Sequence, residues 1–378
     1  MVGKEQMPSP LTPIEDLAEA LHGAYPELDA LRSTGGAPVY LVGGAVRDLL
    51  LGGGRADIDL VVVGDPGDLA AGLGAETLTE HERFATAKIE MEGHAIDIAA
   101  ARSETYRRPG DLPEVIPADE IEADLARRDF TVNAMAVPLR GEPQLIDPHA
   151  GRADLESRLL RVLHRASFAD DPTRAIRAAR YAARLDFGLE SETADLVRAA
   201  DLTTVSADRR RTELSRLAAE PSAPRGLELL ADWGLIETRE GGIELATKVN
   251  EVLAMPGWNG QAERAEAVLA AALGPLGGEL DLAASTPTRP SQAVELVTGR
   301  DPLELVLARA LGGEWLDQYM ERWRAVRLEI DGADLIAAGV PQGPGLGRGL
   351  QAALRAKLDG EAEGREQELA IALAAAGA

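Results

Sequence analysis

The 378-residue sequence contains no cysteine, and this absence excludes several kinds of site. Without cysteine there is no disulfide framework, no thiolate zinc site and no cysteine nucleophile. Long hydrophobic runs are also missing, since none reaches the roughly 18 residues that a membrane-spanning helix needs. The first residues lack the basic and then apolar pattern of a secretory signal. We therefore expect a cytoplasmic protein with no membrane partner.

Lysine and positive charge are scarce. Only four lysines occur, and 39 basic residues face 63 acidic ones, a formal net charge of −24. Residues 1–150 carry a net −15, whereas residues 151–220 carry 13 basic and 12 acidic residues, a net +1. The total charge disfavours a nucleic-acid partner. Any RNA binding is therefore expected to be localised to the arginine-rich middle segment and to be sensitive to salt.

The pattern of apolar residues predicts an α+β protein. Short apolar runs at 39–42, 57–63 and 94–100 are typical of strands, and 45–51 is typical of a helix. An amphipathic helix is expected at 14–31. Segment 274–300 is rich in Gly, Pro, Ser and Thr and predicts a loop or linker.

From residue 153 onward the patterns are mostly helical. The predicted helices are 159–164, 172–185, 191–200, 209–219, 225–233, 262–273, 302–310, 315–327, 333–338, 349–357 and 365–376. The resulting plan is a small α/β head followed by an all-α region. The expected divisions are an N-terminal helix and linker at 1–37, a head at 38–148, a helical neck at 149–220, a helical body at 221–327 and a helical tail at 328–378.

A glycine pair follows the first predicted strand. Gly43 and Gly44 stand where a helix begins, so free backbone N–H groups and the helix dipole can attract an anion. Glycine also removes the side chain that would block a phosphate. Arg47, in the first turn, can add charge-assisted hydrogen bonds. The alternative is an ordinary tight turn.

Two carboxylates, Asp57 and Asp59, lie two residues apart on the next predicted strand. This spacing directs both to one face of the sheet. Neighbouring carboxylates repel each other unless a cation lies between them, and Mg²⁺ commonly takes one or two carboxylates together with substrate phosphates. The alternative is a solvated polar face. With the glycine pair, these residues would hold a nucleoside triphosphate and its metals.

Other nucleotide and metal signatures are absent. The sequence has no G-x-x-x-x-G-K-[ST] motif, which excludes a P-loop. Its five histidines form no His-Asp cluster, so no appended phosphohydrolase domain is expected.

The motifs, in order, resemble those of the class II tRNA nucleotidyltransferase and bacterial poly(A) polymerase family, within the polymerase-β-like nucleotidyltransferases. The matching segments are LVGGAVRDLLLG at 41–52, DIDLVV at 57–62, DIAAARSETY at 97–106, DLARRDFTVNA at 124–134, DDPTR at 170–174, IDGADL at 330–335 and GPGLG at 343–347. The resemblance implies a polymerase-β-like head that performs catalysis.

The resemblance also implies roles for residues of the head. Asp57 and Asp59 would hold two Mg²⁺ ions, and Asp97 is the candidate third carboxylate. The residues expected around the ribose and phosphates are Arg127, Arg128, Asp129 and Asn133. We also expect one of the two arginines to pair with Asp129 and hold the turn.

In the neck, the resemblance implies that Asp171 and Arg174 read the base. Cytosine and adenine both present an exocyclic amine beside a ring-nitrogen acceptor, so a carboxylate acceptor and an arginine donor would admit CTP and ATP. Asp171 is also expected to cap the following helix. Arg177 shares the face of Arg174. The motif departs from the family at Asp170, where glutamate is usual.

The resemblance places the helix that carries Arg209, Arg210 and Arg211 near the nucleotide and the RNA end. A solvated helix face is the alternative. The loop 107–113 corresponds to a flexible loop associated with the switch from C to A addition, and its presence favours a complete enzyme. The tail is expected to bind tRNA.

The expected function is template-independent addition or repair of the 3′-terminal CCA of tRNA from CTP and ATP, with release of pyrophosphate. Three alternatives remain. A poly(A) polymerase shares the head and neck. A partial enzyme would add only CC or only A. A non-catalytic nucleotide- or RNA-binding protein could retain the fold without the chemistry.

Overall fold

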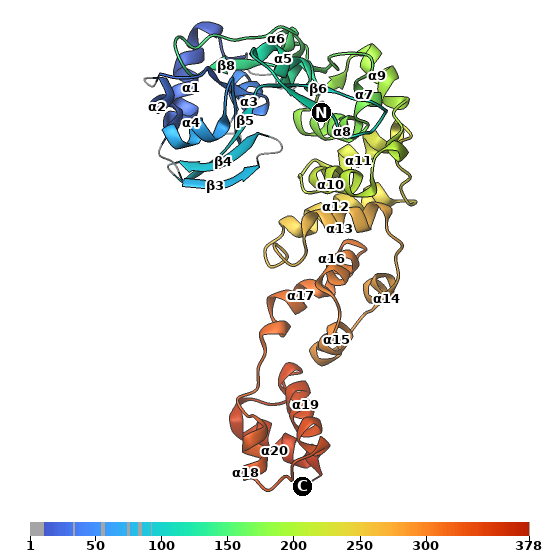
Figure 1. The fold of residues 1–378 in the computed structure, drawn as a ribbon. Coiled ribbons are helices and arrows are strands. Elements are labelled where there is room, and N and C mark those ends of the chain that lie inside the picture. Colours follow the sequence, from blue (N-terminus) through green and yellow to red (C-terminus); the bar gives the residue numbers. More distant parts are fainter. Residues whose placement is uncertain are drawn as a thin grey trace. The chain divides into compact units, whose positions relative to one another are not determined.

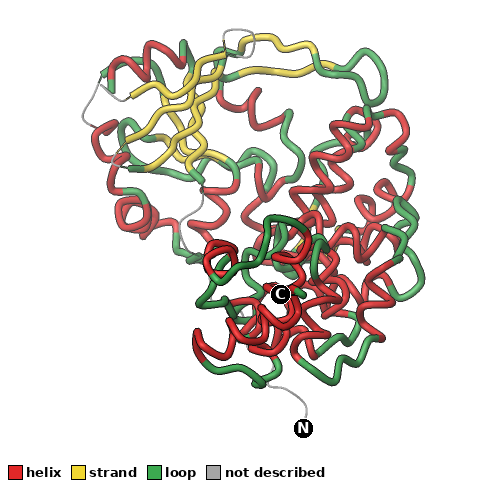
Figure 2. The backbone as a smooth tube through the Cα atoms, turned by 90° about the horizontal axis from the view of Figure 1, so that it is seen from below, coloured by secondary structure: helices red, strands yellow, loops and turns green. Residues whose placement is uncertain are grey.

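The structure is a computed structural model that describes residues 11–32, 35–53, 57–73, 76–81, 85–91 and 93–377. The chain forms two compact units, Met1–Leu214 with Asp232–Leu235, and Ser215–Ala231 with Ile236–Ala378. Within the described residues, every strand belongs to the first unit, and the second is built from helices and loops (Figures 1 and 2). The predicted α+β class is therefore confirmed.

A six-stranded mixed sheet forms the centre of the first unit, in the order β3-β4-β5-β2-β1-β8. Its strands are β1 (Val39–Val42), β2 (Ile58–Val62), β3 (Glu76–His81), β4 (Thr86–Met91), β5 (His94–Ala100) and β8 (Ala136–Pro138). Strands β2 and β5 are parallel, and the other neighbours are antiparallel. The parallel register pairs Asp59 with Asp97.

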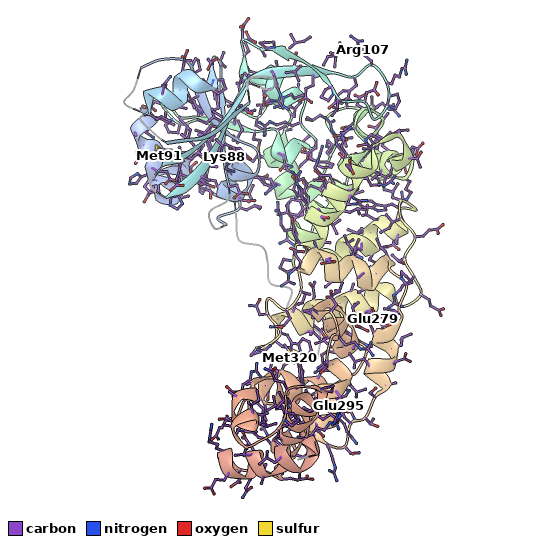
Figure 3. All side chains as sticks on the ribbon, turned by 60° about the horizontal axis from the view of Figure 1, so that its bottom comes forward. Lys88, Met91, Arg107, Glu279, Glu295 and Met320 are labelled. Carbon is purple, nitrogen blue, oxygen red and sulfur yellow. The ribbon has the colours of Figure 1, made fainter. Side chains whose placement is uncertain are left out.

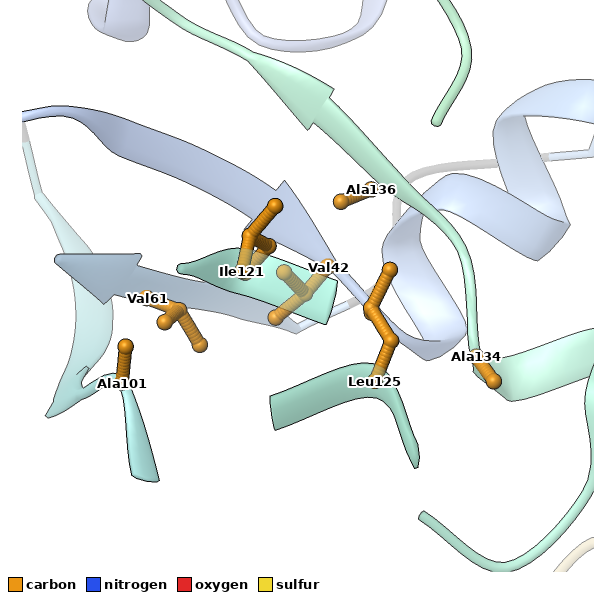
Figure 4. Close-up of a cluster of buried hydrophobic side chains, with 7 residues drawn as sticks. All are labelled: Val42, Val61, Ala101, Ile121, Leu125, Ala134 and Ala136. Atoms are coloured by element: carbon orange, nitrogen blue, oxygen red, sulfur yellow. The ribbon is translucent and has the colours of Figure 1, made fainter. Parts of the chain in front are cut away.

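Helix α5 (Ile121–Ala126) covers part of one sheet face. Its Leu125 packs with Val42 and Val61 in a buried cluster (Figure 4). Side chains alternate along a strand, so Asp59 lies on the same face as Val61. Asp59 is nevertheless exposed. One face of β2 is therefore buried under α5 at Val61 and exposed at Asp59.

The other helices of the first unit surround this sheet and continue into the neck. They are α1 (Leu17–Ala24), α2 (Asp29–Arg32), α3 (Gly44–Leu50), α4 (Pro66–Gly72), α6 (Gly151–Glu156), α7 (Ser167–Asp170), α8 (Thr173–Leu185) and α9 (Ser191–Arg198). Helix α10 (Ala207–Ala218) leads into the second unit. Two small ribbons complete the first unit, β6 (Arg102–Thr105) with β7 (Glu114–Pro117), and β9 (Leu159–Leu160) with β10 (Gly188–Leu189).

The second unit contains a succession of helices. They are α11 (Ala223–Asp232, whose last residue belongs to the first unit), α12 (Gly242–Ala254), α13 (Arg264–Leu273), α14 (Gly278–Ala284), α15 (Pro290–Val297), α16 (Pro302–Ala310), α17 (Trp315–Glu321), α18 (Gly332–Ala337), α19 (Pro344–Leu358) and α20 (Gly364–Ala376). The last three enclose a core around Leu335, Ala353 and Ala372. Ion pairs also stabilise this core, since the fully buried Glu368 accepts from Lys357 at 2.6 Å.

Two predictions in the first unit are wrong. The expected helix at 14–31 is interrupted at Tyr25, because Pro26 lacks the N–H that would continue the helical hydrogen bonding. Residues 159–164 do not form a helix. Instead Leu159–Leu160 forms β9, which pairs with β10, and Arg158 adopts a positive φ of 54° that ends the preceding helical segment.

In the second unit, the predicted linker at 274–300 is also wrong, because it contains α14 and α15. Glycine and proline are typical of loops, but here they begin helices. Gly278 starts α14, and Pro290 occupies the first turn of α15, where its missing N–H costs no hydrogen bond. Helix α12 was not predicted at all.

No single helix among the described residues is long and apolar enough to cross a membrane. Helices α13 and α14 reach that length only in combination, with a bend of 92° between them.

Candidate active site

Gly43 forms the turn between β1 and α3, as predicted. Its φ is +69°, and an added Cβ would lie 2.8 Å from Nη1 of Arg128. Only glycine satisfies both the left-handed backbone and the close approach of this guanidinium. Gly44 begins α3 directly behind it.

Replacing Gly43 by alanine is expected to lower nucleotide incorporation by roughly tenfold, because the methyl group displaces a charged hydrogen-bond donor. Gly52→Ala is the matched control, since Gly52 has a φ of +63° with nothing within 4 Å of its Cβ position. Both variants should lose about 1–2 kcal/mol of stability from the positive φ. Equal activity of the two variants would contradict the proposed importance of the contact with Arg128.

Arg47 lies behind this turn, with its side chain directed into the protein. Its side chain is 2% exposed. Nη1 donates to Oδ1 of Asn133 at 2.6 Å, and Nε donates to Oδ1 of Asp48 at 2.7 Å. The guanidinium also lies 5.5 Å from the ring centre of Tyr181. The structure therefore directs Arg47 toward the protein, where it orients Asn133.

The three predicted metal-binding carboxylates lie close together on, or just before, the two central strands of the sheet, β2 and β5. Asp57 immediately precedes β2, Asp59 lies in β2, and Asp97 is the β5 partner of Asp59. All three are exposed. Desolvation raises the pKa of Asp59, and the carboxylates of Asp97 and Asp57 raise it further, although Arg128 opposes them. A cation bound beside Asp59 would stabilise its ionised form.

These carboxylates fit a Mg²⁺ ion that takes its remaining ligands from the substrate. Within the described residues, no group of three or more His, Asp or Glu side chains is placed to hold a metal ion. A site with one or two carboxylates is what Mg²⁺ uses when phosphates supply the remaining ligands. Asp97 has another partner, since its Oδ2 lies 3.4 Å from Nζ of Lys88 on β4. Figure 3 labels Lys88 on the first unit. The role of Asp97 as a metal ligand stays a prediction.

A cavity of about 380 Å³ brings most of the predicted site residues together. The predicted residues that line it are Gly43, Gly44, Asp59, Arg127, Arg128, Asp129, Asn133, Asp171, Arg174, Arg177 and Arg209. They come from the turn between β1 and α3, the central strand β2, the segment after α5, the start and first turns of α8, and helix α10. Residues that are up to about 170 positions apart in sequence therefore share one chamber of nucleotide size.

Arg127 and Arg128 are held by Asp124 of α5. Nη2 of Arg127 lies 2.7 Å from Oδ1, and Nη2 of Arg128 lies 2.9 Å from Oδ2. The expectation that one of these arginines pairs with Asp129 is wrong. Asp124 precedes them by three and four residues, the spacing at which side chains meet on a helical turn.

Asp129 pairs instead with Arg177 of α8. Its Oδ2 accepts from Nε of Arg177 at 3.1 Å, and its Oδ1 accepts from Nδ2 of Asn133 at 3.1 Å. Burial alone would raise the pKa of Asp129, but Arg177 and Asn133 outweigh it and hold the pKa below its usual value. The head and the neck are thus joined by an ionised carboxylate at the cavity wall.

Asp171 lies at the start of α8 and is 7% exposed. Its Oδ1 accepts from the Thr173 N–H at 3.0 Å, but the helix begins at Thr173 with Pro172 as its N-cap, so the prediction of Asp171 as the N-cap is wrong by one residue. Burial would raise the pKa of Asp171, yet Arg177, the Thr173 hydroxyl and Arg209 together lower it. Asp171 is therefore an ionised hydrogen-bond acceptor.

The two oxygens of Asp171 are unequally satisfied. Oδ1 accepts from the N–H and the hydroxyl of Thr173 and from Nη2 of Arg209, all within 3.0 Å. Oδ2 has one longer contact among the described residues, 3.3 Å to Nη2 of Arg177. Oδ2 is consequently the oxygen with capacity for a further donor.

Arg174 is 3% exposed and is fixed at two points. Nη1 donates to Oγ of Ser167 at 2.6 Å, and Nη2 donates to the carbonyl of Arg127 at 2.7 Å. Among the described residues its Nε has no hydrogen-bond partner. Arg174 thus links the neck to Arg127 of the head, and its buried Nε is unpaired among the described residues.

The three arginines of α10 differ in their surroundings. Arg209 lines the cavity, where Nη1 donates to the Gly110 carbonyl at 2.8 Å. Arg210 donates to the Leu202 carbonyl at 3.2 Å. Arg211 is exposed, and its Nη1 lies 4.0 Å from Oδ1 of Asp208. Arg209 therefore belongs to the nucleotide cavity, and contact of the other two with RNA stays a prediction.

Replacing Arg209 by alanine is expected to lower kcat/KM for CTP and ATP by roughly tenfold or more, because Asp171 and loop 107–113 both lose a charged donor. Steady-state incorporation measures the effect. Arg198→Ala is the control, since Arg198 is an exposed neck arginine bonded to its own helix. Unchanged incorporation by the Arg209 variant would show that its two contacts are dispensable.

Sequence reasoning missed three cavity residues, Glu104, Tyr106 and Tyr181. Glu104 accepts from Arg127 Nη1 at 2.8 Å and from the Tyr106 hydroxyl at 3.0 Å. Burial and the Glu104 charge raise the pKa of Tyr106 to about 12. The signal was present in the R-x-E-x-Y spacing, which places residues 102, 104 and 106 on one side of an extended segment.

The first unit matches a known domain family, the Poly A polymerase head domain, over residues 39–161. The chain is 36% identical to the CC-adding tRNA nucleotidyltransferase of Deinococcus radiodurans over 330 residues, 82% of each protein. It is 30% identical to the CCA-adding enzyme of Geobacillus stearothermophilus, with 88% of this chain and 92% of that enzyme covered.

A-adding relatives are matched over shorter stretches. The enzyme of Halalkalibacterium halodurans is 42% identical over 207 residues, 51% of this chain and 48% of that protein. Two other A-adding relatives are covered over 45% and 20% of their length, so the chain spans less than half of these proteins.

Solved structures agree with this relationship. The apo form II of a CCA-adding enzyme has a TM-score of 0.76 at 27% identity, with 96% of both chains covered. The Thermotoga maritima CCA-adding enzyme complexed with tRNA has a TM-score of 0.70 at 28% identity, covering 97% of this chain and 96% of that one.

The paired sheet carboxylates, the glycine turn and the arginine-lined cavity on this fold define a polymerase-β-like nucleotidyltransferase. Within that class, the chain belongs to the tRNA nucleotidyltransferase and poly(A) polymerase family.

Proposed function

We propose that this protein adds or repairs the 3′-terminal CCA of tRNA from CTP and ATP and releases pyrophosphate. The observation that carries the proposal is a single cavity in which Asp59 of the sheet faces Asp171 and Arg174 of the neck. Transfer chemistry and base choice can therefore act on the same nucleotide. Related structures are described as complexes of a CCA-adding enzyme with ATP and with CTP.

Base choice follows from hydrogen-bond direction. The less satisfied Oδ2 of Asp171 can accept from the exocyclic amine of cytosine or adenine, and the guanidinium of Arg174, which lines the cavity, can donate to the adjacent ring nitrogen. Uracil and guanine present the reverse order of donor and acceptor, which leaves both protein groups unpaired. Unpaired buried polar groups discriminate strongly between substrates.

The central strands β2 and β5 carry the carboxylates of the proposed reaction centre. Asp57 and Asp59 are the residues that would hold two Mg²⁺ ions, with Asp97 as a third candidate. The metal, when bound, lowers the pKa of the RNA 3′-hydroxyl and stabilises charge on the leaving pyrophosphate. Arg128 at the glycine turn adds a fixed positive charge beside the phosphates.

The tRNA is the proposed acceptor, approached through the arginines of α10 and held by the body and tail. Recognition of the acceptor stem would rest on shape and phosphate contacts. We assign catalysis to residues 38–148, base selection to 149–220 and tRNA binding to 328–378, and we place the reaction in the cytoplasm with its substrates.

A partial activity is the main second candidate. The relative with 82% of both chains aligned is a CC-adding enzyme, which favours CC addition specifically. The loop 107–113, by contrast, favours the full reaction, since Arg209 joins it to Asp171.

The first test separates an enzyme from a binding protein. The purified chain is mixed with Mg²⁺, labelled CTP and a tRNA transcript that ends before CCA, and pyrophosphate release is measured alongside incorporation. Equimolar incorporation and pyrophosphate are expected. Nucleotide binding without either product would identify a non-catalytic binding protein.

A further inference from the structure

Asp124 lies on α5 beside the cavity, and its side chain is completely buried. Each of its oxygens receives one guanidinium along a full edge. Oδ1 accepts from Nε and Nη2 of Arg127 at 2.9 and 2.7 Å, and Oδ2 accepts from Nε and Nη2 of Arg128 at 3.3 and 2.9 Å. Burial alone would raise the pKa of Asp124, but the two guanidinium groups hold it below its usual value.

The shared carboxylate separates two adjacent like charges. Arg127 extends toward the neck side, where Nη1 reaches Glu104 at 2.8 Å and its own carbonyl accepts from Arg174. Arg128 extends toward the glycine turn, with Nη1 2.8 Å from the Cβ position of Gly43. Among the described residues no hydrogen bond occupies this Nη1, so it is available for a phosphate.

We propose that Asp124 is a positioning residue that divides Arg127 and Arg128 between the ribose and the triphosphate of the bound nucleotide without touching it. This inference rests on the proposed nucleotidyl transfer. Asp124 would act only through the arginines, which contact parts that CTP and ATP have in common.

The arrangement predicts a specific kinetic signature. Substituting Asp124 should weaken the binding of CTP and of ATP by the same factor, because the ribose and the triphosphate are the same in both nucleotides. Discrimination against UTP and GTP should remain, because Asp171 and Arg174 read the base. A loss of general stability would not produce this combination.

The test uses Asp124→Asn and the charge-conserving Asp124→Glu in the full chain. We expect KM for both CTP and ATP to rise roughly 10- to 100-fold in Asp124→Asn, the size of effect that charged hydrogen bonds produce. Asp124→Glu should fold like the wild type and show a smaller rise. Asp154→Asn is the matched control, since Asp154 is a buried carboxylate paired with Arg161 away from the cavity.

A double-mutant cycle decides whether Asp124 acts through the arginines. In an Arg127→Ala/Arg128→Ala background, Asp124→Asn should change KM for CTP less than threefold. An undiminished effect in that background, an effect confined to one nucleotide, or unchanged KM in both Asp124 variants would overturn the proposal. Calorimetric titration with CTP and with cytidine supplies a readout apart from turnover, and the loss of affinity is expected to be larger for CTP, because cytidine has the ribose but lacks the triphosphate. An inactive wild type would refute the proposed function instead.

Discussion

Replacing Asp59 by asparagine is expected to reduce incorporation by about 10³-fold or more, since a metal-binding carboxylate supports several kcal/mol of transition-state stabilisation. Asp59 lies on the central strand β2 with Asp57 and Asp97 as neighbours, and burial together with these two carboxylates raises its pKa. Asparagine keeps the size of the side chain but not its charge. The fall should appear in kcat measured with saturating CTP and Mg²⁺.

The fold should survive this change because the Asp59 side chain is exposed. Asp68→Asn provides the control, since Asp68 is an exposed carboxylate on α4 of the same head. Retention of more than a tenth of wild-type kcat by Asp59→Asn, with a normal thermal transition, would remove Asp59 from the reaction centre.

Replacing Asp171 by asparagine is expected to cut the preference for CTP over UTP by about 100-fold, because a charged acceptor becomes a group that can also donate. Oδ2 of Asp171 is the acceptor with free capacity, and its ionised state is maintained by Arg177 and Arg209. The ratio of kcat/KM values for single-nucleotide incorporation measures the preference.

Asp201→Asn is a closely matched control for this experiment. Oδ1 of Asp201 accepts from the backbone and hydroxyl of Thr203 at 2.9 and 2.6 Å, almost the same capping geometry as Asp171 with Thr173. Asp201 is exposed and does not line the cavity. A preference that falls equally in both variants would point to loss of the cap rather than loss of base reading.

Local signals in the sequence were sufficient to predict much of the site. The turn at Gly43, the carboxylate at Asp59 and the neck residue Asp171 were each marked by motifs whose geometry is set within a few residues. The helix positions of 302–310 and 172–185 were also predictable, since their amphipathic spacing agrees with the packing.

The pairing of charges was not predictable in the same way. Asp129 is adjacent to Arg128 in sequence, yet its partner Arg177 is 48 residues away and is brought close by the packing of α8. Arg128, which lies just after α5, instead turns back to Asp124 in that helix. Tertiary packing decides these ion pairs, so sequence neighbours are poor guides to them.

The chain is acidic as a whole, but its positive charge is concentrated at the proposed nucleotide site. Five arginines line the cavity, Arg127, Arg128, Arg174, Arg177 and Arg209, although the whole chain carries −24. The positive groups needed for phosphates are thus concentrated where the nucleotide would bind.

The most direct test of the proposed function uses three tRNA transcripts, ending before CCA, after C and after CC. Each is incubated with Mg²⁺ and with CTP, ATP or both, and products are resolved at single-nucleotide length. We predict that all three transcripts are extended to CCA and no further. Products that stop at CC, extension only from CC to CCA, or a long ladder of A residues would contradict full CCA addition and identify a CC-adding enzyme, an A-adding enzyme or a poly(A) polymerase.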